Sequence, residues 1–103
     1  MTSRTVLVTG AAHRIGAAIT RDLHEHGMYV VIHCNQSRST AEELAEDLNN
    51  IRSGSAHIVQ GDLLAFESYR EIIEQACGFN ERLDVLINNA SSFFPTPIEN
   101  INL

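Results

Sequence analysis

The residues best suited to chemistry lie in the stretch TGAAHRIG (residues 9–16), directly after the apolar run VLV (6–8). A strand that enters a glycine turn and then a helix points backbone N–H groups and the positive helix end at one spot, which suits a phosphate. Gly10 can adopt dihedral angles closed to other residues, and Gly16 lets helix and strand approach closely. No Gly-Lys-Ser/Thr follows, so this is not a Walker loop. Taken alone, the stretch also fits an ordinary glycine-bearing turn.

Hydrophobic patterning predicts the strands and helices that must position this loop. Short apolar runs at 6–8, 29–32, 57–59 and 85–87 predict four strands buried in a parallel sheet. Three helices are predicted between them. Their predicted inward-facing residues are Ile15, Ala18, Ile19 and Leu23 in the first, Leu44, Ala45, Leu48 and Ile51 in the second, and Tyr69, Ile72, Ile73 and Ala76 in the third.

Capping signals predict where the helices begin and end. Ser39 with Glu42 three residues later forms a capping box for the second helix. Gly27 and Gly78 are expected to end the first and third helices. The alternation of four strands with three helices predicts an α/β fold: the N-terminal half of a doubly wound (Rossmann) parallel sheet, with strand order 3-2-1-4, truncated after the fourth strand. Residues 1–103 are expected to form one incomplete domain of this fold.

Three motifs, in order and each at the end of a predicted strand, resemble the short-chain dehydrogenase/reductase family. They are the T-G-x-x-x-R-x-G loop, GDL at 61–63 and NNAS at 88–91. Arg14 stands where the family usually has a third glycine. The resemblance implies that Asp62 meets the adenine ring and that the N-N-A turn lies along the cofactor. The implied cofactor-binding residues are Gly10, His13, Arg14, Ile15, Gly16, His33, Asn35, Ser37, Arg38, Asp62, Leu63, Asn89, Ala90 and Ser91.

Arg14 and the run NNASSFFPTP (88–97) narrow the resemblance to the pteridine reductases. In those enzymes the arginine matching Arg14 reaches both the cofactor pyrophosphate and the pterin. The residue matching Ser91 hydrogen-bonds the pterin, and the aromatic residue matching Phe93 stacks the pterin against the nicotinamide. An aromatic face with polar groups at its edge also suits a flat heteroaromatic ligand on physical grounds. Ordinary packing of Phe93 against the core remains the alternative.

The segment after the second predicted strand bears on which nicotinamide cofactor is bound. NAD-specific folds of this kind place an Asp or Glu there to bind the ribose 2′-hydroxyl, whereas this chain has HCNQSRS (33–39), without an acidic residue. Asn35, Ser37 and Arg38 could bind a 2′-phosphate, which favours NADPH. Pteridine reductases have a similar His-x-x-x-Ser pattern, here His33 and Ser37, that holds this phosphate. The chain departs from them at Asn35 and Gln36, where relatives are often more basic, so NADPH affinity could be weaker.

The family's catalytic Tyr-x-x-x-Lys pair has no counterpart in these 103 residues. All seven basic residues are arginines, and the two tyrosines, Tyr29 and Tyr69, fall in a predicted strand and helix. We therefore expect the chain alone to be inactive and to represent the cofactor-binding first part of an enzyme that transfers hydride from NADPH to a pterin. The alternatives are a short-chain reductase for another carbonyl substrate and a non-catalytic nucleotide-binding or interaction module. An open fourth strand would favour self-association.

Composition and residue spacing argue against several other classes of protein. A net charge of −6 argues against a nucleic-acid partner. No stretch reaches the ~20 apolar residues of a membrane span. Cys34 and Cys77 lack metal-ligand spacing, so no metal site is expected, and both are predicted to be buried free thiols in a reducing cytoplasm.

Overall fold

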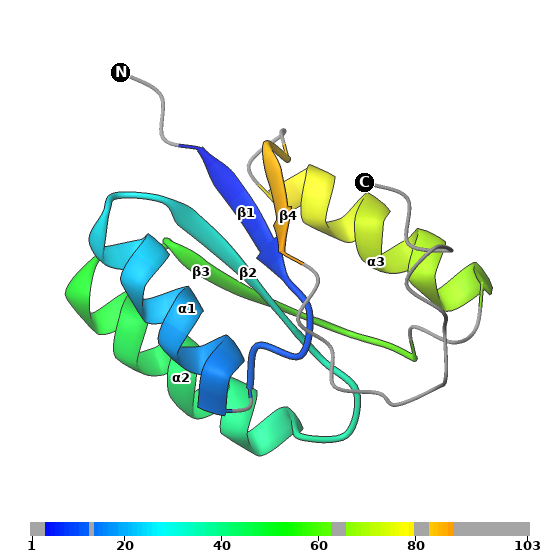
Figure 1. Ribbon diagram of the computed structural model, residues 1–103, viewed down its shortest axis with the longest axis horizontal. Coiled ribbons are helices and arrows are strands. Elements are labelled where there is room, and N and C mark those ends of the chain that lie inside the picture. Colours follow the sequence, from blue (N-terminus) through cyan, green and yellow to red (C-terminus); the bar gives the residue numbers. More distant parts are fainter. Residues whose placement is uncertain (1–3, 13, 63–65, 80–82, 88–103) are drawn as a thin grey trace.

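A computed structural model describes residues 4–12, 14–62, 66–79 and 83–87 of the chain. Strands and helices alternate along it (Figure 1), as the hydrophobic runs predict. The elements in chain order are β1 (Thr5–Val8), α1 (Arg14–Glu25), β2 (Tyr29–Cys34), α2 (Arg38–Ile51), β3 (Ala56–Gln60), α3 (Phe66–Phe79) and β4 (Val85–Ile87).

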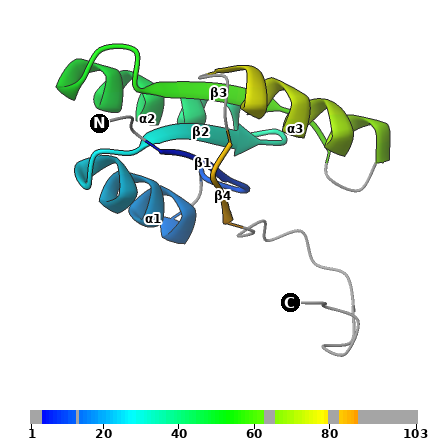
Figure 2. The ribbon, with the colours of Figure 1, turned by 90° about the horizontal axis from the view of Figure 1, so that it is seen from above.

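The four strands form one parallel sheet in the order β3-β2-β1-β4, which confirms the predicted order 3-2-1-4. β1 lies in the middle, where Leu7 pairs with Val31 of β2 and with Leu86 of β4. Helices α1 and α2 cover one face of the sheet and α3 covers the other (Figure 2). Both faces are therefore buried, and the chain has the layered architecture of a doubly wound fold.

Alternate residues of the central strands enter two separate hydrophobic cores. Val6, Val8, Val30 and Ile32 pack in the core under α1 and α2. The intervening residues, Leu7 and Val31, pack on the other face with Val59 of β3 and with Ile72 and Ala76 of α3. This alternation follows from the two-residue period of a strand, and it explains why β1 and β2 read as continuous apolar runs.

The buried face of α1 matches the predicted one only in part, at Leu23, which packs against the core. Gly16, Thr20 and His24, each four residues apart, form the buried stripe, while Ile15 is 69% exposed and Ala18 is also exposed. The stripe can be polar because Thr20 Oγ1 donates a hydrogen bond to the Gly16 carbonyl oxygen at 2.7 Å, and because His24 also has a buried partner.

Two details of α2 correct the sequence-based expectation. The helix begins at Arg38 with Ser37 as its N-cap, and the Ala41 N–H bonds the Ser37 carbonyl oxygen at 3.0 Å, so the box expected at Ser39 does not form the helix start. Leu44, Ala45 and Leu48 are buried as predicted, but Ile51 is 72% exposed. Ile51 is the last helical residue, beyond which the chain turns away at Arg52 into an extended conformation.

Helix α3 begins at Phe66 and buries Ile72 and Ala76, as predicted. It continues through Gly78 to Phe79, so Gly78 does not end it, whereas Gly27 after α1 has the positive φ of 93° that a glycine stop requires. Cys34 is buried, but Cys77 is exposed, contrary to prediction, because its helical position faces away from the sheet. Among the described residues, no helix is long and apolar enough to cross a membrane.

Two aliphatic positions near the end of α2 provide a matched test of this packing. Leu48→Ala removes a side chain that is 1% exposed, so we expect a loss of about 2–5 kcal/mol in the free energy of unfolding. Ile51→Ala changes an exposed side chain, so its effect should stay within about 0.5 kcal/mol. Denaturant unfolding followed by circular dichroism measures both, and equal losses in the two variants would contradict the assigned helix face.

Candidate nucleotide-binding site

The carboxyl ends of the four parallel strands lie along one edge of the sheet, and the turn after β1 is fixed there by consecutive backbone hydrogen bonds. The Thr9 N–H donates to the Ile87 carbonyl oxygen at the end of β4, at 3.0 Å. The Ala11 N–H donates to the His33 carbonyl oxygen near the end of β2, also at 3.0 Å. Gly10, between them, has a φ of 64°, a conformation that favours glycine. The predicted glycine turn is therefore present, anchored to the strands on both sides.

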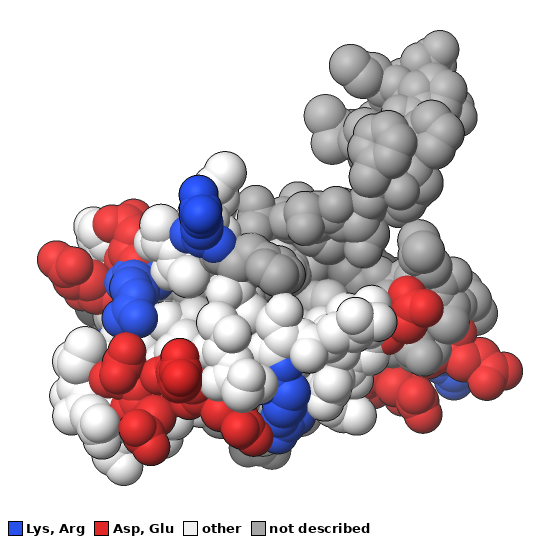
Figure 3. Space-filling view, turned by 90° about the horizontal axis from the view of Figure 1, so that it is seen from below, with Lys and Arg blue, Asp and Glu red and all other residues white. Residues whose placement is uncertain are grey.

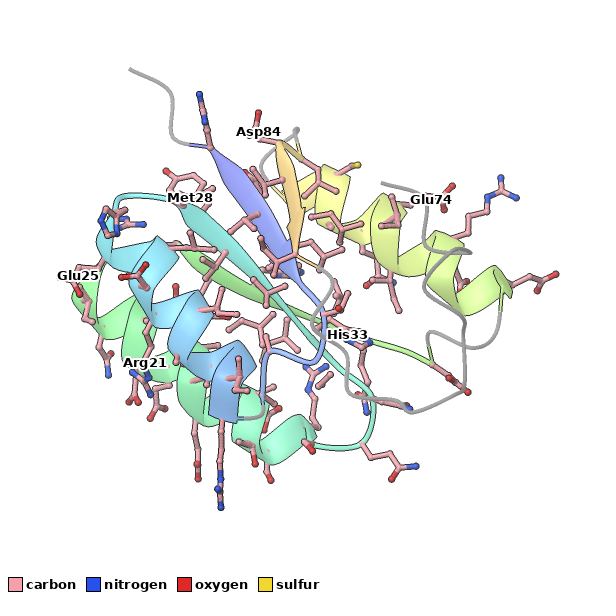
Figure 4. All side chains as sticks on the ribbon, viewed as in Figure 1. Arg21, Glu25, Met28, His33, Glu74 and Asp84 are labelled. Atoms are coloured by element: carbon pink, nitrogen blue, oxygen red, sulfur yellow. The ribbon has the colours of Figure 1, made fainter. Side chains whose placement is uncertain are left out.

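The side chain of His33 connects this turn to the end of β3 (Figure 4). The Gly10 N–H donates to His33 Nδ1 at 3.0 Å, and His33 Nε2 lies 2.9 Å from the Gly61 carbonyl oxygen. The residue is 2% exposed. The Gly61 N–H in turn bonds the Cys34 carbonyl oxygen at 3.1 Å. The ring thus lies inside the edge of the sheet and holds backbone groups on both of its sides.

These bonds determine which backbone amides the loop offers to a ligand. The N–H groups of Gly10 and Ala11 are directed at His33 and are used within the protein. Among the described residues, the amides of the first turn of α1 have no partner within the helix, so they could bind a phosphate. Gly10 therefore contributes the shape of the turn, while the start of α1, at Arg14, contributes donors and the positive end of the helix dipole.

A second helix begins at the same edge. Helix α2 starts at Arg38, with Ser37 as an N-cap whose side chain makes no capping bond. Neither α1 nor α2 has an acidic residue in its first turn. In the view from below, acidic side chains gather toward the α3 side and the α1–α2 side, and the surface between them is mostly uncharged with a basic side chain among it (Figure 3). The helix starts therefore provide the positive potential that an anionic ligand requires.

The predicted site residues differ in exposure, and Gly10 and Ser37 are half-buried. Arg14, Ile15, Asn35, Arg38 and Asp62 are exposed, as a ligand contact requires. Gly16 and His33 are buried, so neither is placed to touch a ligand directly. The predicted residues outside the described part of the chain are His13, Leu63, Asn89, Ala90, Ser91 and Phe93.

Arg38 and Asn35 already have partners in the protein. Arg38 Nε donates to Glu42 Oε2 at 3.2 Å, in an exposed pair one helical turn apart. The Asn35 carbonyl oxygen accepts a hydrogen bond from Gln60 Nε2 at 2.8 Å. An exposed pair of this kind contributes little to stability, so a phosphate could compete with Glu42 for the arginine.

Within the described ranges, no group of three His, Cys, Asp or Glu side chains could hold a metal ion.

A separate buried polar cluster lies at the opposite, amino-terminal edge of the sheet. His24 Nε2 and Ser55 Oγ are 2.6 Å apart. The Arg52 guanidinium donates to the carbonyl oxygens of His24 and Met28, at 3.1 and 2.6 Å. These contacts join the end of α1 to the segment between α2 and β3. They account for His24 as a structural residue, distant from the carboxyl edge.

A parallel doubly wound sheet with a glycine turn and helix starts free of acidic residues at its carboxyl edge defines an α/β protein of the nucleotide-binding class. Its sequence relatives narrow the class. The short chain dehydrogenase profile matches residues 4–103, and the chain therefore belongs to the short-chain dehydrogenase/reductase family. The implied ligand is a nicotinamide cofactor, and the glycine turn and helix starts fit its phosphates.

Individual relatives match nearly the whole of this chain. Pteridine reductase 1 of Leishmania tarentolae is 40% identical over 114 residues, covering 94% of this chain and 39% of that protein. An uncharacterized oxidoreductase of Methylorubrum extorquens is 34% identical, covering 95% of this chain and 39% of its own. A short-chain dehydrogenase/reductase homologue of Bacillus subtilis is 28% identical, and the alignment covers 96% of this chain and 90% of that protein. The chain thus spans 39% of the length of the first two relatives.

The sequence did not reveal how His33 works, although the residue itself was singled out. The His-x-x-x-Ser pattern suggested direct contact with a phosphate, whereas the ring binds Gly10 and Gly61 instead. A usable signal was present: His33 lies in an otherwise apolar strand, and a buried imidazole there needs two hydrogen-bonding partners.

Two buried histidines predict that stability falls as the pH is lowered. Burial lowers the pKa of His33 below its ordinary value of 6.5, against the opposing effect of its bond to Gly61. Burial and the Arg52 guanidinium likewise lower the pKa of His24. The unfolded chain therefore takes up protons near pH 6.5 that the folded chain resists, and stability is lost as the pH falls through the folded pKa values.

The measurement is the free energy of unfolding between about pH 8 and about pH 5. We expect it to decrease below pH 6.5, and His33→Asn, which removes one of the two titrating groups, should flatten the decrease. The exposed His26, whose pKa is raised by its bond to the Asp22 carbonyl oxygen, acts in the opposite direction, so His26→Asn should steepen it. Stability that rises on acidification would contradict the buried neutral histidines.

Proposed function

We propose that the chain is the cofactor-binding N-terminal part of an NADPH-dependent pteridine reductase. The observation that carries the proposal is the carboxyl edge of the sheet, where a glycine turn and two helix starts free of acidic residues lie together. The 40% identity to a pteridine reductase supports the pterin as substrate. In this proposal the full-length enzyme transfers hydride from NADPH to the pterin ring in the cytoplasm. This chain supplies the hydride donor's binding site, and the catalytic Tyr-x-x-x-Lys pair lies outside these 103 residues.

Each part of the cofactor has proposed partners. The first turn of α1 and Arg14 bind the pyrophosphate, since helix amides and a guanidinium both favour a divalent anion. Asn35, Ser37 and Arg38 bind the 2′-phosphate at the start of α2. Asp62 meets the adenine. The remaining proposed contacts along the cofactor are His13, Ile15, Leu63, Asn89, Ala90 and Ser91.

The proposed pterin site uses Arg14, Ser91 and Phe93. Arg14 would contact both the pyrophosphate and the pterin, which places the two ligands side by side. A flat heteroaromatic ring is bound well by an aromatic face with polar groups at its edge, and Phe93 and Ser91 supply these two elements. This assignment rests on the resemblance of their sequence segment to pteridine reductases.

The free edge of β4 supports a proposal about association. Among the described residues β4 pairs with β1 alone, and Leu86 at its centre is 43% exposed. An unpaired, apolar strand edge is a template for pairing with another strand. We infer that this edge pairs with a further strand, supplied either by a longer chain or by a second copy.

A nucleotide-binding module without turnover is the second candidate function. The Bacillus subtilis relative favours it, because the alignment covers 90% of that protein. The two candidates share the cofactor site and differ in the fate of the bound cofactor. Under the first, the cofactor is oxidised by a pterin once the tyrosine–lysine pair is present, whereas under the second NADPH binds and stays unchanged.

Cofactor preference can be tested with a pair of matched arginines. Arg38 and Arg70 each form an exposed ion pair one helical turn apart, with Glu42 and Glu74. Arg38→Ala should weaken NADPH binding by about tenfold, because it removes a guanidinium from the 2′-phosphate, and should leave NADH binding unchanged. Arg70→Ala, on α3, should affect neither. Calorimetric titration measures the four affinities, and equal loss of NADPH and NADH binding would contradict the proposed phosphate contact.

Substrate class can be tested at Phe93. In the full-length protein, Phe93→Ala should reduce affinity for a dihydropterin by about tenfold, since a stacking surface is lost, without reducing affinity for NADPH. Phe93→Tyr, which keeps the aromatic face, serves as the control. Unchanged pterin affinity in Phe93→Ala would favour another carbonyl substrate.

A further inference from the structure

His33 stands out among the buried polar side chains because it lies at the proposed ligand site, yet is closed off from any ligand. Its ring is 2% exposed, and both nitrogens contact backbone groups. Asn49, another side chain that bonds several backbone groups, lies at the opposite edge of the sheet. There its Oδ1 accepts from the Ser55 and Ala56 N–H groups, each at 2.9 Å. The two residues thus hold backbone groups in place at different ends of the strands.

The partners of His33 determine its protonation state. The Gly10 backbone N–H can only donate, so Nδ1 accepts and carries no proton. The Gly61 carbonyl oxygen can only accept, so Nε2 carries the proton and donates. The ring is therefore the neutral Nε2–H tautomer. Burial, which lowers the pKa of His33, favours the same neutral state.

The two backbone groups belong to the two loops that border the proposed dinucleotide. Gly10 forms the turn that leads into α1, and Gly61 immediately precedes the exposed Asp62. The rigid imidazole ring spans the gap between these loops with bonds of 3.0 and 2.9 Å. The relative placement of the two loops thus depends on the His33 side chain.

We propose that His33 is a positioning residue for the dinucleotide, holding the Gly10 turn and the Gly61–Asp62 segment in the placement that lets one ligand reach both. The inference rests on the proposed dinucleotide function. It assigns His33 no contact with the ligand. Its bond to Gly10 keeps that N–H directed inward and leaves the first turn of α1 to face the phosphates. Its bond to Gly61 holds the backbone next to the proposed adenine contact.

The test compares three variants by calorimetric titration with NADPH and by thermal denaturation. His33→Phe keeps a ring but removes both side-chain bonds, and should weaken NADPH binding by about tenfold. His33→Asn offers an acceptor near the former Nδ1 position but loses the bond to Gly61, so it should recover only part of that loss. Asn49→Ala removes backbone bonds at the remote edge, so it should lower Tm and leave NADPH affinity unchanged. The bond from the Ala11 N–H to the His33 carbonyl oxygen is backbone in all variants.

The outcomes separate the two proposals. Undiminished NADPH affinity in His33→Phe overturns the positioning role alone, as does an equal loss in Asn49→Ala, which would show general destabilisation. A wild-type chain that binds neither NADPH nor NADH overturns the proposed function and the positioning role together. If His33→Phe does not fold, ¹⁵N NMR of the His33 ring in the wild-type chain still tests the positioning role, because it shows which ring nitrogen carries the proton. An unprotonated Nδ1 together with weakened binding in His33→Asn relative to wild type supports the role, and a protonated Nδ1 overturns it.

Discussion

The hydrogen bonds of His33 are the constraint on which the carboxyl edge of the sheet depends. Its carbonyl oxygen and Nδ1 accept from Ala11 and Gly10, and its Nε2 donates to Gly61. One residue of β2 therefore fixes the turn after β1 and the end of β3. A buried backbone N–H or carbonyl group, such as those of Gly10 and Gly61, could not stay unpaired without a large cost in stability. The imidazole meets the requirement with one acceptor and one donor on a rigid ring.

This constraint clarifies how a glycine loop without the usual third glycine can serve a phosphate. The amides of Gly10 and Ala11 are used to hold the loop in place, so the proposed phosphate contact falls to the start of α1 at Arg14. The proposed contact is thus made by the helix end and an arginine, on a turn whose shape is already fixed. A loop fixed before binding loses less conformational entropy when the ligand arrives.

Much of the fold could be predicted from sequence because both faces of the central strands are buried. The run 6–8 of β1 is apolar at every position, and parallel βαβ connections leave few possible strand orders. The face of α1 was predicted only in part: Leu23 packs against the core as expected, whereas Ile15 and Ala18 are exposed. Thr20 and His24 are polar, yet both are buried with hydrogen-bonding partners, so apolar residues alone did not mark the inner face of the helix.

The sequence by itself determined the class of fold, the strand order and the absence of a carboxylate after β2, because these follow from local composition and connectivity. Only the tertiary structure decided which amides of the loop remain for a ligand and what His33 does. Those properties depend on contacts between residues 23 and 28 positions apart, from His33 to Gly10 and Gly61. Hydrogen bonding across a sheet edge depends on how the strands are placed side by side, which no local sequence pattern specifies.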